Sequence, residues 1–185
     1  MAARGGGSGT GKFIIGLILG LLILPAAVIL YFRFGAPPVA TADKPFPLEA
    51  QVVKVPLDAR ISREAPKAAP FGESEDVFEG GATLYRRECA SCHGTPGHDV
   101  PYGKFMYPHA PQLWAKHKTG SVVGVSDDPV GETYWKVANG IRLTGMPAYG
   151  KMLTDTEMWQ IAILLKNADQ PLPDPVNKIL TAPTP

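Results

Sequence analysis

The chain has 185 residues, which leaves room for one ordinary domain with additions but not for two large domains. Its formal net charge is +1, from 18 Lys and Arg against 17 Asp and Glu, so no strong field points to nucleic acid or to an acidic substrate. Two cysteines are too few for a disulfide-stapled scaffold. The 19 prolines and 20 glycines are numerous and unevenly spread, and this unevenness divides the chain into segments.

An uncharged apolar run, residues 13–32, follows a glycine-rich segment, residues 1–12, that carries an arginine and a lysine. A helix of that length, at about 1.5 Å per residue, spans roughly 30 Å, the thickness of a bilayer core. Basic residues before such a helix favour the cytoplasm. We therefore predict a cytoplasmic segment 1–12, a single-pass helix in the inner cell membrane, and a periplasmic remainder. An A-x-A pattern ending at Ala42 leaves open a cleaved signal peptide.

Prolines recur through residues 33–74 and again through residues 170–185, with little periodicity. This composition predicts a semi-rigid, proline-rich tether and an irregular, proline-rich C-terminal tail. Within the tether, the run LDARISREA is compatible with a short helix. The compact part is then residues 75–169, which is small for a self-sufficient core. A large apolar cofactor would supply some of the missing buried surface.

Both cysteines stand beside a histidine in the run ECASCHG, as Cys89, Cys92 and His93. The preceding residues read as a helix capped by Ser74. On a helix, cysteines three residues apart share a face, and His93 lies one turn from Cys89. This arrangement suits one covalently attached haem, with a thioether bond to each cysteine and the iron bound by the histidine, and C-x-x-C-H is typical of such attachment.

The two cysteines have three alternatives to haem attachment. A structural zinc site needs four ligands, and neither a third cysteine nor a histidine pair of the right spacing is present. A thioredoxin-like dithiol needs a βαβ context that the pattern lacks. A plain disulfide also remains open. Export favours haem, because attachment of this kind takes place outside the cytoplasm.

Haem iron takes a second axial ligand, and a methionine opposite a histidine gives a high-potential electron carrier. Met146 is the favoured residue, because in TGMPAYG Pro147 stiffens the loop and Gly145 lets the backbone approach closely. Met158 falls within a predicted helix and is expected in the core. The weaker alternatives are two further methionines, Met106 and Met152, and a second histidine, His98, His109 or His117.

The run LTDTEMWQIAILLKNAD predicts one more helix. Thr154 and Glu157 form a T-x-x-E capping box at its start, and Asn167 followed by Pro171 ends it.

Four features now stand in order along residues 76–168: CASCH, APQL, NGIRLTGMPAYG and the capped final helix. Together they resemble class I cytochrome c domains. The resemblance implies an all-α domain whose first and last helices cross around one haem c. The transmembrane helix and the proline-rich tether precede that domain. It also implies that Gly81 and Tyr85 on the first helix meet an aromatic residue, Trp159, on the last.

The resemblance further implies residues that contact the cofactor. The carbonyl of Pro111 would accept the second ring hydrogen of His93 and so fix its tautomer. Trp114, Arg142 and Tyr149 are candidates for contacts with the haem propionates or the crevice wall.

These expectations describe a non-enzymatic electron carrier whose iron cycles between Fe(II) and Fe(III). With His93 and Met146 both bound, the iron has no free place for a substrate. Its partners would be respiratory or photosynthetic redox proteins, not nucleic acid. The alternative is a fixed cytochrome c subunit of a membrane oxidoreductase complex, such as a terminal oxidase, a quinol-oxidising complex or an exported dehydrogenase. A third reading, haem-based sensing or peroxidase chemistry, requires Met146 to be displaced.

Overall fold

The computed structural model describes residues 9–183. Most of the predicted cytoplasmic segment 1–12 and the last two residues of the predicted tail lie outside the described residues. The chain divides into two units, residues 1–45 and residues 46–185.

The first unit contains one long helix, α1 (Gly9–Phe34). It includes the whole predicted run 13–32 and continues past both ends of it. At about 1.5 Å per residue its 26 residues extend about 39 Å, which is enough to cross a bilayer. Its large apolar side chains are exposed, and none of its residues is buried. Pro25 lies inside the helix, a position that membrane helices tolerate.

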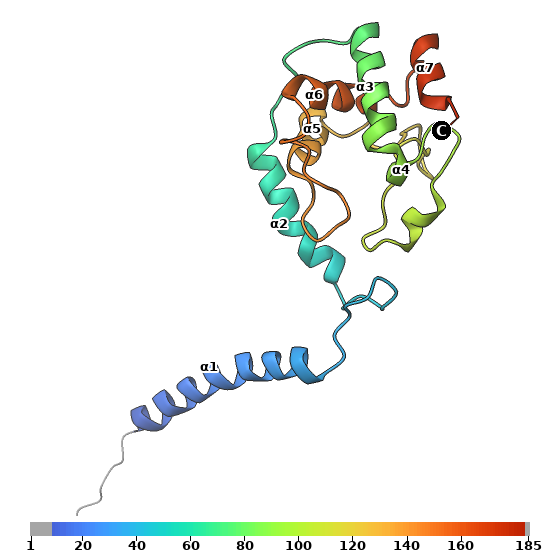
Figure 1. The fold of residues 1–185 in the computed structure, drawn as a ribbon. Coiled ribbons are helices and arrows are strands. Elements are labelled where there is room, and N and C mark those ends of the chain that lie inside the picture. The colour runs from blue at the N-terminus through green and yellow to red at the C-terminus, as the bar shows by residue number, and fades with distance from the viewer. Residues whose placement is uncertain (1–8, 184–185) are drawn as a thin grey trace, which may run out of the picture. The chain divides into compact units, whose positions relative to one another are not determined.

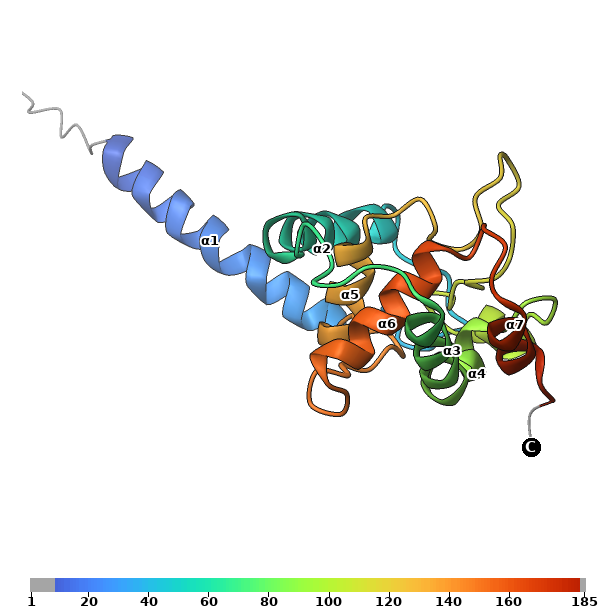
Figure 2. The ribbon, with the colours of Figure 1, turned by 90° about the horizontal axis from the view of Figure 1, so that it is seen from above.

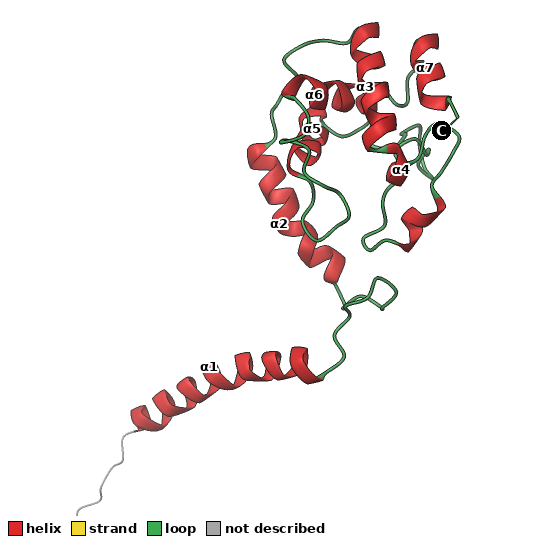
Figure 3. Ribbon diagram, in the orientation of Figure 1, coloured by secondary structure: helices red, strands yellow, loops and turns green. Residues whose placement is uncertain are grey.

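The second unit is helical, and Figure 3 shows no strand among the described residues. Two isolated β-bridges, Thr95 with His98 and Lys116 with Val123, close loops. The elements, in chain order, are α2 (Glu49–Glu64), α3 (Glu75–Glu88), α4 (Ala90–His93), a 3-10 helix η1 (Pro101–Phe105), α5 (Val130–Asn139), α6 (Asp155–Lys166) and α7 (Asp174–Thr181).

Both predicted helix caps are confirmed. Ser74 accepts a hydrogen bond from the backbone N–H of Val77 at 3.3 Å and begins α3. Thr154 and Glu157 form the complete capping box of α6. These contacts satisfy backbone donors that a helix start otherwise leaves unpaired. The starts of the two helices are therefore fixed by local sequence.

Helices α3 and α6 pack across each other and form the centre of the unit (Figure 1). The contact is close because Gly81 lies directly against Gln160 and Leu164. The prediction that Trp159 meets Gly81 and Tyr85 at this crossing is wrong. Residues 160 and 164 share one helix face, whereas Trp159 points to another side and stacks on Tyr134 of α5 at 4.2 Å between ring centroids.

The apolar core gathers around this crossing. Met158 is 2% exposed and belongs to it, as expected. The remaining core residues come from α3, α6 and the loops, with two from α7 and one from α5: Ala82, Leu84, Tyr85, Leu113, Val137, Tyr149, Leu153, Ile161, Leu164, Leu165, Val176 and Leu180.

The range 33–74, expected as a proline-rich tether, contains the helix α2, which packs against α5. The expected short helix at LDARISREA therefore lies within a longer one. Ile61 is its buried residue, and Pro56 lies inside it. A proline inside a helix removes one backbone hydrogen bond, so packing against α5 has to support this helix.

The expectation of an irregular tail over 170–185 is wrong, because α7 lies within that range. Pro175 stands in its first turn, where a proline costs no helical hydrogen bond. Val176 and Leu180, one turn apart, are fully buried, and α7 packs along α3 in both ribbon views (Figures 1 and 2). Arg86 of α3 donates to the carbonyls of Leu180 and Ala182 at the end of α7.

Candidate functional site

A cavity of about 640 Å³ opens within the second unit. Its size is within the range of cofactor pockets. The wall is formed by α2, α4, α5 and α6, together with the loops that follow η1 and α5. Six of its residues carry the chemistry considered below: Cys89, Cys92, His93, Pro111, Met146 and Tyr149.

The two cysteines and the histidine lie where the chain leaves α3 and enters α4. Cys89 is the cap residue between the two helices, and its N–H donates to the carbonyl of Tyr85 at 2.8 Å. The N–H groups of Cys92 and His93 both donate to the carbonyl of Cys89. This short helical turn keeps both thiols, which are free, in the cavity wall. Burial is the main cause that raises the pKa of the Cys89 thiol to about 12.

His93 has a fixed tautomer. Its Nδ1 lies 2.7 Å from the carbonyl oxygen of Pro111, which can only accept, so Nδ1 carries the hydrogen and donates it. Burial lowers the pKa of the imidazole, and the hydrogen bond to Pro111 opposes that change. The ring is thereby held neutral, and the lone pair of Nε2 is left available as a ligand.

The loop that carries Pro111 is tied to α4 by Gln112, which the sequence analysis did not single out. Its side-chain amide donates to the carbonyl of Cys92 at 3.1 Å, and its oxygen accepts from the N–H of Val100 at 2.7 Å. The N–H of Leu113 also donates to the carbonyl of His93 at 3.0 Å. Side chain and backbone together hold Pro111 beside the imidazole. Gln112 is partly buried and lies inside the APQL run, but nothing in that run alone indicates which groups its side chain contacts.

Met146 lies on the loop after α5 and is partly buried in the cavity wall. Its N–H donates to the hydroxyl of Thr144 at 3.1 Å. Gly140 has a φ of +63°, and a Cβ there would stand 2.7 Å from the backbone of Pro147. Only glycine allows this loop to fold back so closely. The Met-Pro segment is therefore held by backbone contacts.

Met106, an alternative to Met146 as the second ligand, also lines the cavity. A Cβ at Gly145 would overlap its terminal methyl group, so Met106 lies against the loop of Met146. Met152, in contrast, is 66% exposed, and Met158 is in the core. Neither of these two lines the cavity.

The three further candidates differ in position. Tyr149 lines the cavity, and its hydroxyl donates to the carbonyl of Glu88 at 2.8 Å. Trp114 packs edge-on against Tyr85, and its Nε1–H is buried without an acceptor among residues 9–183. Arg142 is exposed. Neither Trp114 nor Arg142 lines the cavity, so only Tyr149 joins the cysteines, His93 and Met146 there.

Polar groups of α5 form another part of the wall. Lys136 lies 2.7 Å from Glu132 and 3.4 Å from Asp128, and all three line the cavity. Burial opposes the charge of Lys136, but the hydrogen bonds and charges of the two carboxylates outweigh it and raise the pKa of the ammonium. One positive charge thus faces two negative ones, which leaves a formal net charge of −1 among these three residues.

The side chains present fit a covalently bound haem. An apolar cavity carries two thiols, one neutral imidazole with a free nitrogen and one thioether, which is the donor set that such a group requires. Within residues 9–183, no three His, Cys, Asp or Glu side chains cluster as they do in a zinc site.

Comparison with known proteins gives one match. Residues 76–165 match the family model described as cytochrome C oxidase, cbb3-type, subunit III. No curated protein and no solved structure matches the chain. The match begins at the start of α3 and ends near the end of α6, so α2 and α7 lie outside it.

Proposed function

Residues 76–165 of this chain form a c-type cytochrome domain, and from that premise we propose that the protein is a membrane-anchored monohaem electron carrier. The family supports haem-based electron transfer in general. The observation that carries the proposal is the shared cavity wall of Cys89, Cys92, His93 and Met146. When bound, the haem iron supplies the change between Fe(II) and Fe(III) that carries one electron.

Each residue has a separate task in this proposal. Cys89 and Cys92 would hold the haem through thioether bonds, and His93 and Met146 would each supply one ligand to its iron. The carbonyl of Pro111 keeps the ring hydrogen on Nδ1 and so directs Nε2 to the metal. With His93 and Met146 both bound to the iron, no place would be left for a substrate, and the protein would act as a carrier without bond chemistry of its own.

The contacts around the haem are proposed as well. Tyr149 packs in the cavity wall, and its hydroxyl bond to Glu88 holds it there. Trp114 offers its unpaired N–H to a propionate. Arg142, which is exposed, would meet a propionate only at the surface.

We place the protein in the inner cell membrane through α1, with the haem domain on the periplasmic side. Support comes from the length and apolar character of α1 and from the basic residues that precede residues 13–32. Electrons would pass between this domain and respiratory or photosynthetic partners.

A specific observation favours a second candidate, a fixed subunit of a membrane oxidoreductase complex. The matching family is described as a subunit of a terminal oxidase. Purification in mild detergent separates the two candidates. A fixed subunit remains in a stable complex with other membrane proteins through gel filtration, whereas a mobile carrier elutes alone.

Absorption spectra of the oxidised and reduced protein, produced together with haem-attachment machinery, test the haem assignment. We expect the weak red charge-transfer band of methionine bound to Fe(III) in the wild type, and its loss in Met146→Ala. Met152→Ala is the matched control and should keep the band, because Met152 is exposed and away from the cavity.

Two results would contradict the proposal. Haem that is extracted by acidified organic solvent from the wild type is not attached through Cys89 and Cys92. A wild-type spectrum without the band, together with carbon monoxide binding to the reduced protein, would instead favour sensing or peroxidase chemistry.

A further inference from the structure

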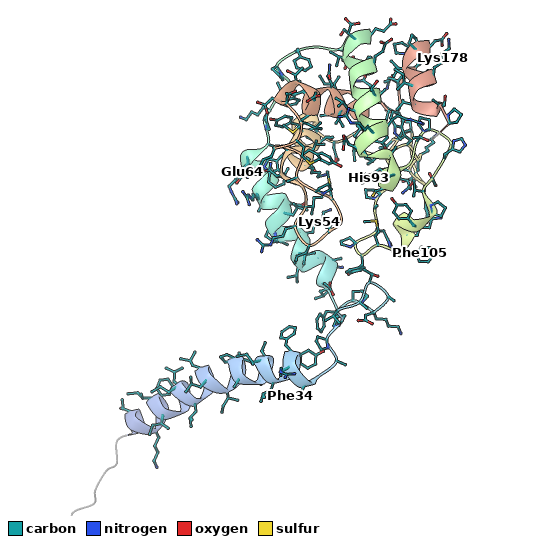
Figure 4. All side chains as sticks on the ribbon, viewed as in Figure 1. Phe34, Lys54, Glu64, His93, Phe105 and Lys178 are labelled. Atoms are coloured by element: carbon teal, nitrogen blue, oxygen red, sulfur yellow. The ribbon has the colours of Figure 1, made fainter. Side chains whose placement is uncertain are left out.

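The helix α2 lies outside the family match, yet it lines the same cavity as the haem-binding residues. Figure 4 labels Lys54 and Glu64 on α2 and His93 on α4. The cavity residues of α2 recur at the spacing of a single helix face. They are Lys54, Leu57, Asp58, Ile61 and Ser62. One side of α2 is thus a continuous part of the cavity wall.

A buried donor fixes the C-terminal end of α2. Trp135 of α5 is 7% exposed, and its Nε1–H donates to a carboxylate oxygen of Glu64 at 3.0 Å. The other carboxylate oxygen accepts from Arg60 at 2.9 Å, and the guanidinium of Arg60 lies 5.8 Å from the Trp135 ring centroid. Without Glu64 the buried indole N–H would lose its acceptor.

Close packing fixes the chain just beyond α2. Gly131, near the start of α5, lies against the backbone carbonyl of Pro66, and a Cβ there would overlap the oxygen. Ile61, one turn before the end of α2, is 5% exposed. The end of α2 therefore rests on α5 by both backbone and side-chain contacts.

Three valines of α2 are exposed. Val52, Val53 and Val55 are 65%, 54% and 68% exposed. The contacts that keep α2 packed on this unit are therefore made by its cavity face and by Glu64, because the three valines bury little surface against the rest of the unit.

We propose that α2 is a wall of the haem cavity, fixed to α5 by Glu64, and that it keeps water and small external ligands away from the cofactor. The inference rests on the proposed function, since it takes haem c as the occupant of the cavity. Leu57 and Ile61 on this face keep water from the cofactor, and exclusion of water disfavours the more highly charged Fe(III) state, so α2 also raises the reduction potential. Opening this wall lowers the potential and exposes the Met146 bond to competitors.

Four variants of the full-length, haem-loaded protein in detergent test this role. Ile61→Ala removes buried wall, and Glu64→Ala removes the acceptor for Trp135. Glu64→Gln keeps an oxygen that accepts from the indole. Val55→Ala is the matched control, at an exposed position of the same helix that does not line the cavity. The probes are imidazole, which competes with Met146 for oxidised iron, and hydrogen exchange of the α2 amides.

We expect imidazole to bind about tenfold faster in Ile61→Ala and in Glu64→Ala than in the wild type. Each substitution removes one buried contact that keeps the wall closed, and the loss of about 1.4 kcal/mol corresponds to a factor of ten in the population of the open wall. In Glu64→Ala the α2 amides should also exchange faster, and the potential should fall in both variants. Glu64→Gln and Val55→Ala should behave as the wild type.

Equal imidazole rates in the wild type, Ile61→Ala and Glu64→Ala would overturn the inference. So would α2 amides that exchange without protection in the wild type. Failure of the proposed function gives a different result, namely a wild type without attached haem or without the methionine band. In that event α2 exchange in the wild type and Glu64→Ala still shows whether α2 is docked on α5.

Discussion

Gly81 of α3 lies directly against the backbone carbonyl of Gln160 in α6. A Cβ added at Gly81 would overlap that oxygen, and a backbone atom cannot rotate away. We therefore expect Gly81→Ala to force the helices apart and to lower the free energy of unfolding by about 1–3 kcal/mol, the usual cost of overpacking. Denaturant unfolding of the haem-loaded protein measures this.

Gly80→Ala is the matched control, one residue earlier in the same helix. Its Cβ would meet only the end of the Gln160 side chain, 2.7 Å away, and that end can turn aside. Since alanine favours a helix over glycine by about 1 kcal/mol, stability should stay level or rise. Equal destabilisation by both substitutions would show that the close approach at Gly81 is not the cause.

Two tyrosine hydroxyls tie the C-x-x-C-H segment to the core. Tyr85 donates to the carbonyl of Gly94, and Tyr149 donates to the carbonyl of Glu88, each at 2.8 Å. Tyr85→Phe and Tyr149→Phe should each lower the free energy of unfolding by about 1 kcal/mol. Tyr85→Phe should cost more, because Tyr85 is fully buried and its bond lies out of reach of water.

Both hydroxyls should remain donors in alkaline solution. Burial is the main cause that raises the pKa of each, for Tyr149 to about 12. Ultraviolet titration of the wild type against each variant measures this. A tyrosine that ionises near its ordinary pKa of 10.0 would show that its hydroxyl is not held as described.

Glu157 gives the start of α6 a dependence on pH. Hydrogen bonds from Thr154, its backbone N–H first, lower the pKa of the carboxyl below its ordinary value of 4.5. A lowered folded pKa stabilises the fold above the unfolded pKa, and this contribution is lost as pH falls through the folded pKa. Glu157→Gln keeps an acceptor for Thr154 but carries no charge that titrates.

The measurement is the free energy of unfolding of the wild type minus that of Glu157→Gln, from about pH 7 to about pH 3. We expect the difference to be constant above the ordinary pKa and to fall below it. A difference that stays constant over the whole range would show that the capping box does not depend on the charge.

Two residues of the Met146 loop have positive φ, but they should respond differently to substitution. Gly140, at +63°, also meets the backbone of Pro147, whereas Leu143, at +64°, is 89% exposed. Gly140→Ala should shift this loop, so that the methionine band disappears at a lower temperature than in the wild type.

Leu143→Gly is the control for that loop. It relieves the left-handed conformation of a leucine, which costs about 1–2 kcal/mol, and touches no other backbone. The band should then persist to at least the wild-type temperature. If Gly140→Ala keeps the band as well as Leu143→Gly does, the close backbone approach at Gly140 does not hold Met146.

The sequence predicted those parts of the fold that local chemistry determines. Ser74 at α3 and the pair Thr154 and Glu157 at α6 mark helix starts through contacts three residues apart, and short patterns of this kind are readable in one chain. The all-α cytochrome domain also followed, because its motifs are local.

The rest depends on contacts between distant segments. In α2 the conspicuous apolar residues, Val52, Val53 and Val55, are exposed, while the cavity face mixes Lys54 and Asp58 with its apolar residues. The face of α2 that packs on the domain therefore has no continuous apolar stripe by which the sequence could identify it. In α7 the prolines read as helix breakers, yet they stand where a helix begins. The pairing of Glu64 with Trp135 spans 71 positions, and no local pattern encodes it.

The position of α2 has a practical consequence for preparing a soluble form. A fragment cut at the family boundaries, residues 76–165, would leave the indole of Trp135 without its carboxylate and open one side of the cavity. It would also uncover the face of α3 on which Val176 and Leu180 rest. A fragment of residues 46–185, the whole second unit, keeps these contacts. Potentials or affinities measured on a shorter one would describe a cytochrome with a different degree of solvent exposure.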